Sequence, residues 1–125
     1  EYYKNLKNVG VVYCDVLGLK KINDSRGHRA GDELIIRASN SLKSNFRQKD
    51  IYRVGGDEFL VLCKDIDEKL FLSKVHSLRE DMKKNNAMMS LGAIWRENVR
   101  DADAFIAEAD EIMYEEKRAY YEAMK

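Results

Sequence analysis

The segment from Tyr52 to Leu62 places two glycines and two acids between two short apolar runs. This pattern is typical of a β-hairpin whose turn lies at the edge of a sheet. Glycines leave the backbone open to a ligand, and carboxylates such as Asp57 and Glu58 can bind a hard cation. Because an isolated Gly-Gly-Asp is more often only a turn, the metal interpretation requires a second acid and a phosphate-binding base elsewhere in the chain.

Composition restricts the classes of function that this chain can have. Lys plus Arg and Asp plus Glu both number 22, so the net charge is zero and no basic field attracts nucleic acid. We therefore expect no nucleic-acid partner and favour a nucleotide or a protein. The two cysteines, Cys14 and Cys63, lie in apolar runs without metal-ligand spacing, which indicates reduced core residues.

The chain of 125 residues has the length of one domain, and we expect residues 1–125 to form it. Residues 1–8 have the pattern of the end of a helix that begins upstream, so we expect a domain that lacks its opening helix. The sequence shows no signal-peptide pattern and no apolar stretch long enough to span a membrane. We expect a cytoplasmic domain without direct membrane contact, in a parent protein that could be anchored elsewhere.

Hydrophobic periodicity predicts an α+β fold. The continuous apolar run over residues 9–14 indicates a strand buried on both faces, and this strand ends at Asp15. The elements expected after it are helices over 18–24 and about 30–46, the hairpin, a helix over 67–84, a strand over 87–95 and a helix capped by Asp101. Helices between strands imply crossovers, so we expect a mixed central sheet flanked by helices, with the hairpin turn beside Asp15. Gly92 would let a neighbouring backbone approach the later strand closely.

Several motifs occur in a consistent order along the chain. They are Gly55-Gly56-Asp57-Glu58-Phe59 preceded by Arg53, the segments Asp15 to Asp24 and Gly27 to Asp32, Ser90-Leu91-Gly92, and Ala109 to Lys117. In this order they resemble the GGDEF domain of diguanylate cyclases, over Val9 to Lys117. The resemblance implies a nucleotidyl-cyclase-like, ferredoxin-like palm with the motif on the hairpin. It also implies that two GTP molecules are condensed into cyclic di-GMP and pyrophosphate across a transient antiparallel homodimer.

The resemblance implies a metal site that holds Mg²⁺ or Mn²⁺. Asp15, the backbone carbonyl of Val16 and the turn acids Asp57 and Glu58 would coordinate the ion. Asp57 and Glu58 would then be the catalytic residues, and Glu58 is also a candidate to assist proton transfer from the attacking ribose hydroxyl.

Two further positions would recognise the guanine base. Asn23 and Asp32 would pair with the guanine edge, according to the resemblance. Such a site rejects adenine because its buried hydrogen-bonding groups would be left unpaired. Taken singly, Asn23 also fits a turn and Asp32 also fits a helix cap.

Two lysines and a short stretch of backbone would bind the triphosphate. The resemblance implies that Lys20 and Lys117 neutralise the β- and γ-phosphates, helped by backbone N–H groups at Gly18 and Leu19. Taken alone, Lys117 would be a solvated helix residue. Tyr121 stands where a second basic phosphate contact often follows, which implies weaker binding of the triphosphate.

Two other departures from the family pattern affect the expected function. Leu17 stands where many members carry a second aspartate or an asparagine, which removes a polar group beside the metal. Arg47 and Asp50 have the arginine-x-x-aspartate form of the family's product-inhibition site, but the segment between Asp50 and Gly55 is one residue shorter than usual. Because a slip of one residue changes the face that a side chain occupies, feedback inhibition by cyclic di-GMP is in doubt.

Two alternative functions stay open at this point. The domain could be a catalytically weak or inactive GTP-binding module that controls a partner domain. Leu17, Tyr121 and the expected lack of the opening helix favour this alternative slightly, and the three intact acids disfavour it. The domain could also be a receptor for cyclic di-GMP at residues 47–50, against which the spacing argues. In each case we expect an upstream sensory domain in a longer parent protein.

Overall fold

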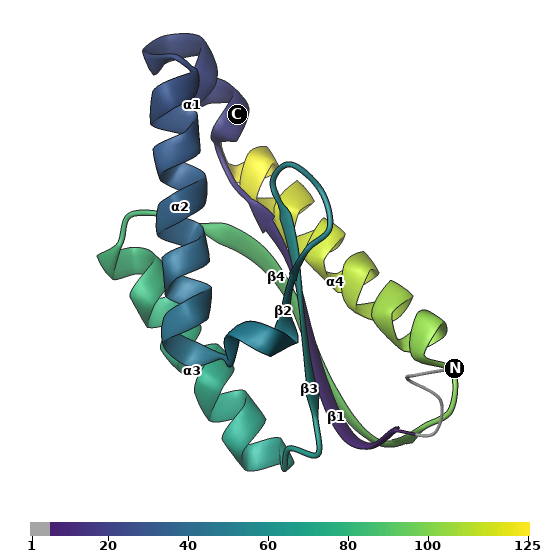
Figure 1. Cartoon of the computed structure of the whole chain (residues 1–125). Helices are drawn as coiled ribbons and strands as arrows, with labels where there is room; N and C mark the ends of the chain where they lie inside the picture. The colour runs from purple at the N-terminus through teal and green to yellow at the C-terminus, as the bar shows by residue number, and fades with distance from the viewer. Residues whose placement is uncertain (1–5) are drawn as a thin grey trace.

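The computed structural model describes residues 6–125, in which strands and helices follow one another in the predicted order (Figure 1). The elements are β1 (Leu6–Val16), α1 (Leu19–Arg26), α2 (His28–Asn45), the 3₁₀ helix η1 (Gln48–Asp50), β2 (Ile51–Arg53), β3 (Glu58–Lys64), α3 (Glu68–Lys84), β4 (Met89–Val99) and α4 (Ala102–Ala123). The predicted α+β class is confirmed. Asp101 caps α4 as expected, since its carboxylate accepts a hydrogen bond from the N–H of Ala104 at 3.0 Å.

The expected helix over residues 1–8 is wrong at residues 6–8, which form the start of β1. In this part of β1, Leu6 pairs with Val99 and Asn8 pairs with Glu97 of β4. Pairing with a neighbouring strand outweighs the local preference of a short polar segment, and no local pattern reveals such a partner. Residues 1–5 lie outside the described residues.

The described residues form one four-stranded sheet with the order β2-β3-β1-β4. Every strand pair in it is antiparallel, so the expectation of a mixed sheet is wrong. The helical crossovers do join strands of like direction, as predicted. However, β3 lies between β1 and β2, and β1 lies between β3 and β4, so the like-directed strands never pair.

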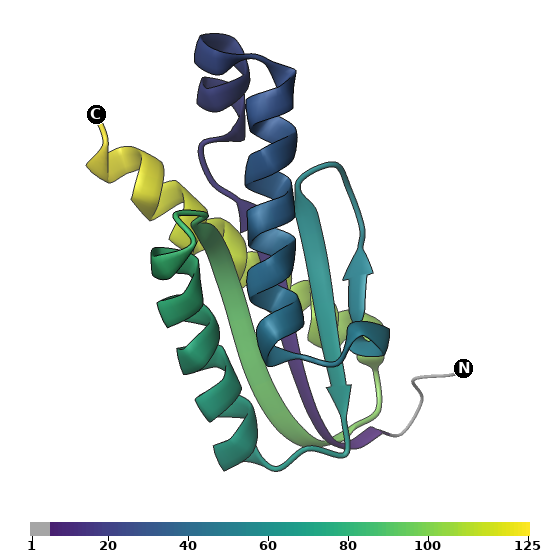
Figure 2. The same ribbon diagram turned by 60° about the vertical axis from the view of Figure 1, so that its left-hand side comes forward.

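Helices cover both faces of the sheet (Figure 1 and Figure 2). Val12 and Cys14 of β1 belong to the core under α2 and α3, whereas Val9 and Val11 belong to the core under α4. This coverage explains the continuous apolar run, because both sides of β1 are buried. Cys14 and Cys63 are free and buried in the core, and burial raises the pKa of Cys63 to about 11. Within residues 6–125, no helix combines the length and apolar character needed to cross a bilayer.

Helix α4 lies directly on β4 at Gly92. A Cβ atom built on Gly92 would be 1.8 Å from the carbonyl oxygen of Ala109 and 2.7 Å from the amide nitrogen of Met113. The predicted close approach at Gly92 is therefore confirmed, with the backbone of α4 as the neighbour. Lys117 follows Met113 by one helical turn, so this contact also sets where Lys117 meets the end of the sheet.

We predict that Gly92→Ala destabilises the domain by about 1–3 kcal/mol or more, because the added methyl group must push the backbone of α4 off the sheet. Urea denaturation measures the change in the free energy of unfolding. Gly56→Ala is the matched control, since among the described residues no atom outside residues 55–57 lies within 4 Å of the added methyl group, and its effect should stay below about 1 kcal/mol. Equal effects of the two substitutions would contradict the close contact.

Candidate active site

The end of β1 brings three side chains into one row across the sheet. Asp15 pairs with Glu58 of β3 on one side and with Ser90 of β4 on the other. Residues directly opposite each other in antiparallel strands point to the same face, which here is the face that α4 covers. The N–H of Val16 also donates to the carbonyl oxygen of Asp57 at 2.9 Å, so the hairpin turn is attached to the end of β1.

Two further hydrogen bonds shape the hairpin turn. The N–H of Val54 donates to the carbonyl oxygen of Glu58 at 3.0 Å, and the guanidinium of Arg53 donates to the carbonyl oxygen of Gly56 at 2.5 Å. The side chain of Arg53 thus stabilises the hairpin turn. The exposed glycines leave open space beside the two acids, consistent with a turn that presents carboxylates.

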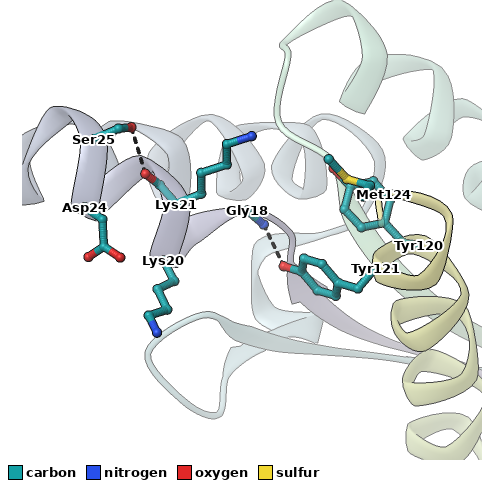
Figure 3. A pocket seen from close by; sticks show the side chains of 8 residues that line it. All are labelled: Gly18, Lys20, Lys21, Asp24, Ser25, Tyr120, Tyr121 and Met124. Atoms are coloured by element: carbon teal, nitrogen blue, oxygen red, sulfur yellow. Dashed lines mark hydrogen bonds between the residues drawn. The ribbon is translucent and has the colours of Figure 1, made fainter.

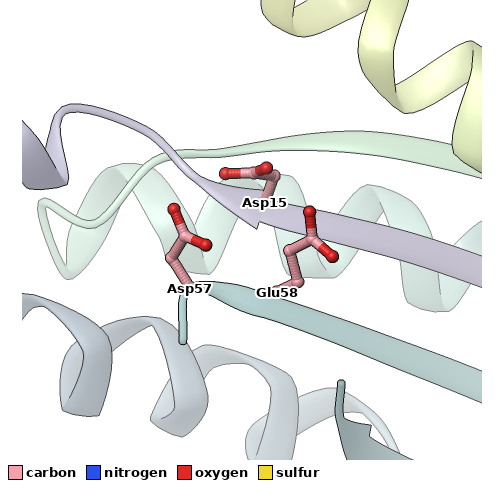
Figure 4. Close-up of side chains that lie close together, drawn as sticks. All are labelled: Asp15, Asp57 and Glu58. Carbon is pink, nitrogen blue, oxygen red and sulfur yellow. The ribbon is translucent and has the colours of Figure 1, made fainter. Parts of the chain in front are cut away.

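Asp15, Asp57 and Glu58 form a cluster of carboxylates (Figure 4). One carboxylate oxygen from each residue lies within 4.8 Å of the others. Asp15 is only 2% exposed, and its Oδ1 is buried without a hydrogen-bond partner among the described residues. Three carboxylates this close repel one another unless protons or a cation neutralise them, so this cluster can hold a divalent metal ion.

Lys117 extends from α4 to this cluster. Its Nζ donates to Oδ2 of Asp15 at 3.1 Å. Burial raises the pKa of Asp15, the hydrogen bond from Lys117 lowers it, and the charges of Asp57 and Glu58 raise it, with a net rise. Burial lowers the pKa of Lys117, but the hydrogen bond and charge of Asp15 outweigh this effect and raise it overall. One lysine therefore faces three acids, and the cluster keeps an excess of negative charge.

Two residues beside the carboxylate cluster, Tyr13 and Ser90, are not among the expected site residues. The hydroxyl of Tyr13 donates to Oε1 of Glu58 at 3.4 Å, and burial followed by the charge of Glu58 raises the pKa of Tyr13. Ser90 is fully buried, and its Oγ has no hydrogen-bond partner among the described residues. Tyr13 could be predicted from the sequence, because side chains two residues apart in a strand point to the same face and Tyr13 lies two residues before Asp15. The position of Ser90 beside Asp15 could not, because it depends on the register between β1 and β4.

The expected guanine-binding residues lie where α1 and α2 pack together. A Cβ atom at Gly31 of α2 would lie 1.8 Å from Oδ1 of Asn23, so the lack of a side chain lets Asn23 lie against α2. Asp32 follows Gly31 and is exposed, and Asn23 is half-buried on α1. The two residues are thus adjacent to the same helix contact, and their pairing with guanine stays a prediction.

The expected phosphate-binding backbone lies at the start of α1. Gly18 has a φ of +77°, and its N–H donates to the hydroxyl of Tyr121 at 3.0 Å (Figure 3). Both residues and Lys20 line a cleft of about 720 Å³ between α1 and the end of α4. The side chain of Leu19 packs against the core, which leaves only its backbone for a ligand.

Arg47 and Asp50 lie apart from the carboxylate cluster. Nε of Arg47 donates to Oδ2 of Asp50 at 3.1 Å, so the two residues bind each other. They line a small cavity beside Cys63, whose partner in β1 is Gly10. Gly10 precedes Asp15 by five residues, which corresponds to about 17 Å along a strand.

The amino-acid sequence matches the family model described as diguanylate cyclase, GGDEF domain, over residues 2–122. The chain belongs to the GGDEF domain family. This GGDEF domain is 31% identical over 121 residues to the diguanylate cyclase DosC of Escherichia coli K12. The alignment covers 88% of this chain and 26% of DosC. The domain is also 31% identical over 120 residues to the probable diguanylate cyclase DgcT of the same organism, covering 86% of this chain and 26% of DgcT. The chain thus spans about a quarter of the length of these curated relatives.

Solved structures confirm the predicted fold of this GGDEF domain. The GGDEF domain of YfiN from Pseudomonas aeruginosa superimposes with a TM-score of 0.77 at 26% identity, covering 90% of this chain and 78% of that chain. A microbial GGDEF domain that interacts with cyclic di-GMP superimposes with a TM-score of 0.73 at 30% identity, covering 90% and 74%. The identification of the family from its motifs is therefore confirmed.

We predict that Asp15→Asn in EDTA is at least as stable as the parent. Because the pKa of Asp15 is raised in the folded state, its ionised form disfavours folding, and the neutral amide removes this penalty. The gain should grow as pH rises from the pKa of the unfolded state through the raised pKa, and vanish below both. Thermal melting across this pH range measures it.

Millimolar Mg²⁺ provides the second half of this test. It should raise the melting temperature of the parent and of Asp103→Asn, an exposed acid in the first turn of α4, but not that of Asp15→Asn. A variant that is less stable in EDTA, or one that Mg²⁺ stabilises as much as the parent, would contradict the assignment.

Proposed function

We propose that this GGDEF domain binds GTP with a divalent cation and, paired antiparallel with a second copy, condenses two GTP molecules into cyclic di-GMP and pyrophosphate. The observation that carries this proposal is the cluster of Asp15, Asp57 and Glu58, with one buried oxygen of Asp15 unpartnered. Membership of a family of diguanylate cyclases supports it. Because GTP is abundant in the cytoplasm, the proposal also implies a cytoplasmic domain.

The donor atoms suit Mg²⁺ or Mn²⁺. Both are hard cations that prefer oxygen ligands, and the unpartnered Oδ1 of Asp15 lies beside two half-buried acids. The carbonyl of Val16, next to Asp15, is the fourth ligand that we propose. When bound, the ion would polarise the α-phosphate and lower the pKa of the attacking hydroxyl.

The side chains around the cluster then have separate roles in the proposed reaction. Glu58 accepts the proton of the 3′-hydroxyl, and the hydroxyl of Tyr13 orients its carboxylate. Lys117 neutralises Asp15 in this structure, and it would be free to contact a β- or γ-phosphate if a cation neutralised that carboxylate instead. Asp57 would bind the cation from the hairpin turn.

The nucleotide would lie across the start of α1. Asn23 and Asp32 would bind the guanine edge at the contact of α1 and α2, and Lys20 would contact the phosphates together with the backbone N–H groups of Gly18 and Leu19. One domain supplies one half of the reaction, because each 3′-hydroxyl attacks the α-phosphate held by the partner copy. The rate then depends on how well two copies are oriented, which a sensory domain in a longer parent would control.

We predict that the domain converts GTP to cyclic di-GMP in Mg²⁺, and that Asp57→Ala lowers the rate by about 10²- to 10³-fold, because it removes a ligand of the cation. Chromatography of the products after incubation measures the rate. Asp103→Ala, which removes an exposed acid at the other end of α4, is the matched control and should leave the rate unchanged.

Two outcomes would count against this proposal. Equal rates for the parent and Asp57→Ala would show that Asp57 of the hairpin turn takes no part in the reaction. A rate per molecule that stays constant as protein concentration rises would contradict a reaction between two half-sites, because encounter of two copies makes it increase until the pair saturates.

We predict that Asp32→Ala weakens GTP binding more than ATP binding, by about tenfold or more. The carboxylate accepts hydrogen bonds from guanine N–H groups that adenine lacks at these positions, so its loss reduces discrimination. Calorimetric titration with each nucleotide measures the two affinities. Glu33→Ala, which removes the neighbouring exposed acid, should keep the preference of the parent; loss of preference in both variants would indicate only a charge effect.

One observation favours a second candidate function, a GTP-binding module that regulates a partner domain. The N–H of Gly18 is bound to Tyr121, and the ammonium of Lys117 is bound to Asp15, so two expected phosphate contacts are taken by protein groups. A protein that binds GTP in Mg²⁺ but forms no cyclic di-GMP at any concentration would support this alternative.

A further inference from the structure

Tyr121 connects the C-terminal end of α4 to the start of α1. Its hydroxyl accepts a hydrogen bond from the N–H of Gly18 at 3.0 Å, and the two residues are 103 positions apart in the sequence (Figure 3). The residue is 42% exposed, and its ring makes an edge-to-face contact with that of Tyr120, with ring centroids 5.1 Å apart. The side chain therefore lies on the surface of the cleft and is not part of the hydrophobic core.

The bonded N–H belongs to a group of amides suited to an anion. Gly18 is the N-cap residue of α1 and has no side chain that could cap the helix. The first turn of α1 contains no acidic residue. The first N–H groups of a helix carry partial positive charge and lack partners within the helix. Within the part of the chain that the structure describes, the hydroxyl of Tyr121 is the side-chain group that satisfies the amide of Gly18.

Charged groups on both sides of Tyr121 strengthen this preference for an anion. Lys20 and Lys21 line the cleft of about 720 Å³ together with Tyr121 and the acid Asp24, so basic groups outnumber acidic ones there. Lys117 lines a second hollow that Tyr121 also borders, where basic side chains again outnumber the acid Glu122. Lys117, one helical turn before Tyr121 on α4, donates to Asp15, so the proposed cation site with its unpartnered oxygen lies beside the contact of Tyr121 with Gly18. A phosphate bound to that cation would reach the same amide.

We propose that Tyr121 determines the affinity for the triphosphate, because its hydroxyl competes with a terminal phosphate for the N–H of Gly18. The inference rests on the proposed function, since GTP is the nucleotide whose phosphates would take this N–H. Binding of the triphosphate must break the hydrogen bond between Tyr121 and Gly18. A nucleoside monophosphate, which has no terminal phosphate to place there, leaves the bond intact.

Tyr121→Phe removes the competing hydroxyl and keeps the ring. The probes are 3′-deoxy-GTP, which lacks the attacking hydroxyl and cannot be condensed, and GMP, each titrated calorimetrically with Mg²⁺. We expect Tyr121→Phe to bind 3′-deoxy-GTP about two- to tenfold more tightly than the parent, the range that the net contribution of one hydrogen bond gives. Its affinity for GMP should not change.

Tyr120→Phe is the matched control, because Tyr120 lines the same cleft one residue away and its hydroxyl has no hydrogen-bond partner among residues 6–125. It should bind both nucleotides as the parent does. The proposal is overturned if Tyr121→Phe binds 3′-deoxy-GTP equally or more weakly, or if it binds GMP more tightly by the same factor.

Inorganic pyrophosphate with Mg²⁺ separates this inference from the proposed function. The amide resonance of Gly18, followed by NMR, should shift at a lower pyrophosphate concentration in Tyr121→Phe than in the parent. If neither protein binds GTP but this difference appears, the proposed function fails and the competition at Gly18 stands. If GTP binds normally and the difference is absent, the competition fails and the proposed function stands.

Discussion

The candidate active site depends on the attachment of the hairpin turn to the end of β1. The N–H of Val16 donates to the carbonyl oxygen of Asp57 at 2.9 Å, and the same register places Asp15 opposite Glu58. Antiparallel pairing then sends both carboxylates to the face covered by α4. A shift of the register by one residue would turn Glu58 to the opposite face and separate the three acids.

The carboxylate cluster at the end of β1 lowers the stability of the folded state. Burial and two neighbouring carboxylates raise the pKa of Asp15, and Lys117 offsets only part of that penalty. Clusters of like-charged side chains are typical of functional sites, where activity requires groups that destabilise the fold locally. The close contact of α4 with Gly92 helps to hold Lys117 in place, so packing far from the acids contributes to the site.

Much of the fold could be predicted from the sequence because its signals are local. The apolar run of β1, the double glycine of the hairpin and the cap at Asp101 each depend on neighbouring residues. The all-antiparallel sheet could not be predicted, because a helical crossover fixes the direction of a strand but not its neighbour. For the same reason the sequence did not reveal the contacts of Ser90, or the hydrogen bond between Gly18 and Tyr121.

The most direct test of the carboxylate cluster is a crystal structure of the domain with Mn²⁺ and 3′-deoxy-GTP, with the metal located by its anomalous scattering. We expect a Mn²⁺ peak bound by Asp15, Asp57 and Glu58, with phosphate oxygens of the nucleotide on the same ion. A nucleotide bound elsewhere, or a metal peak that these three carboxylates do not contact, would contradict it.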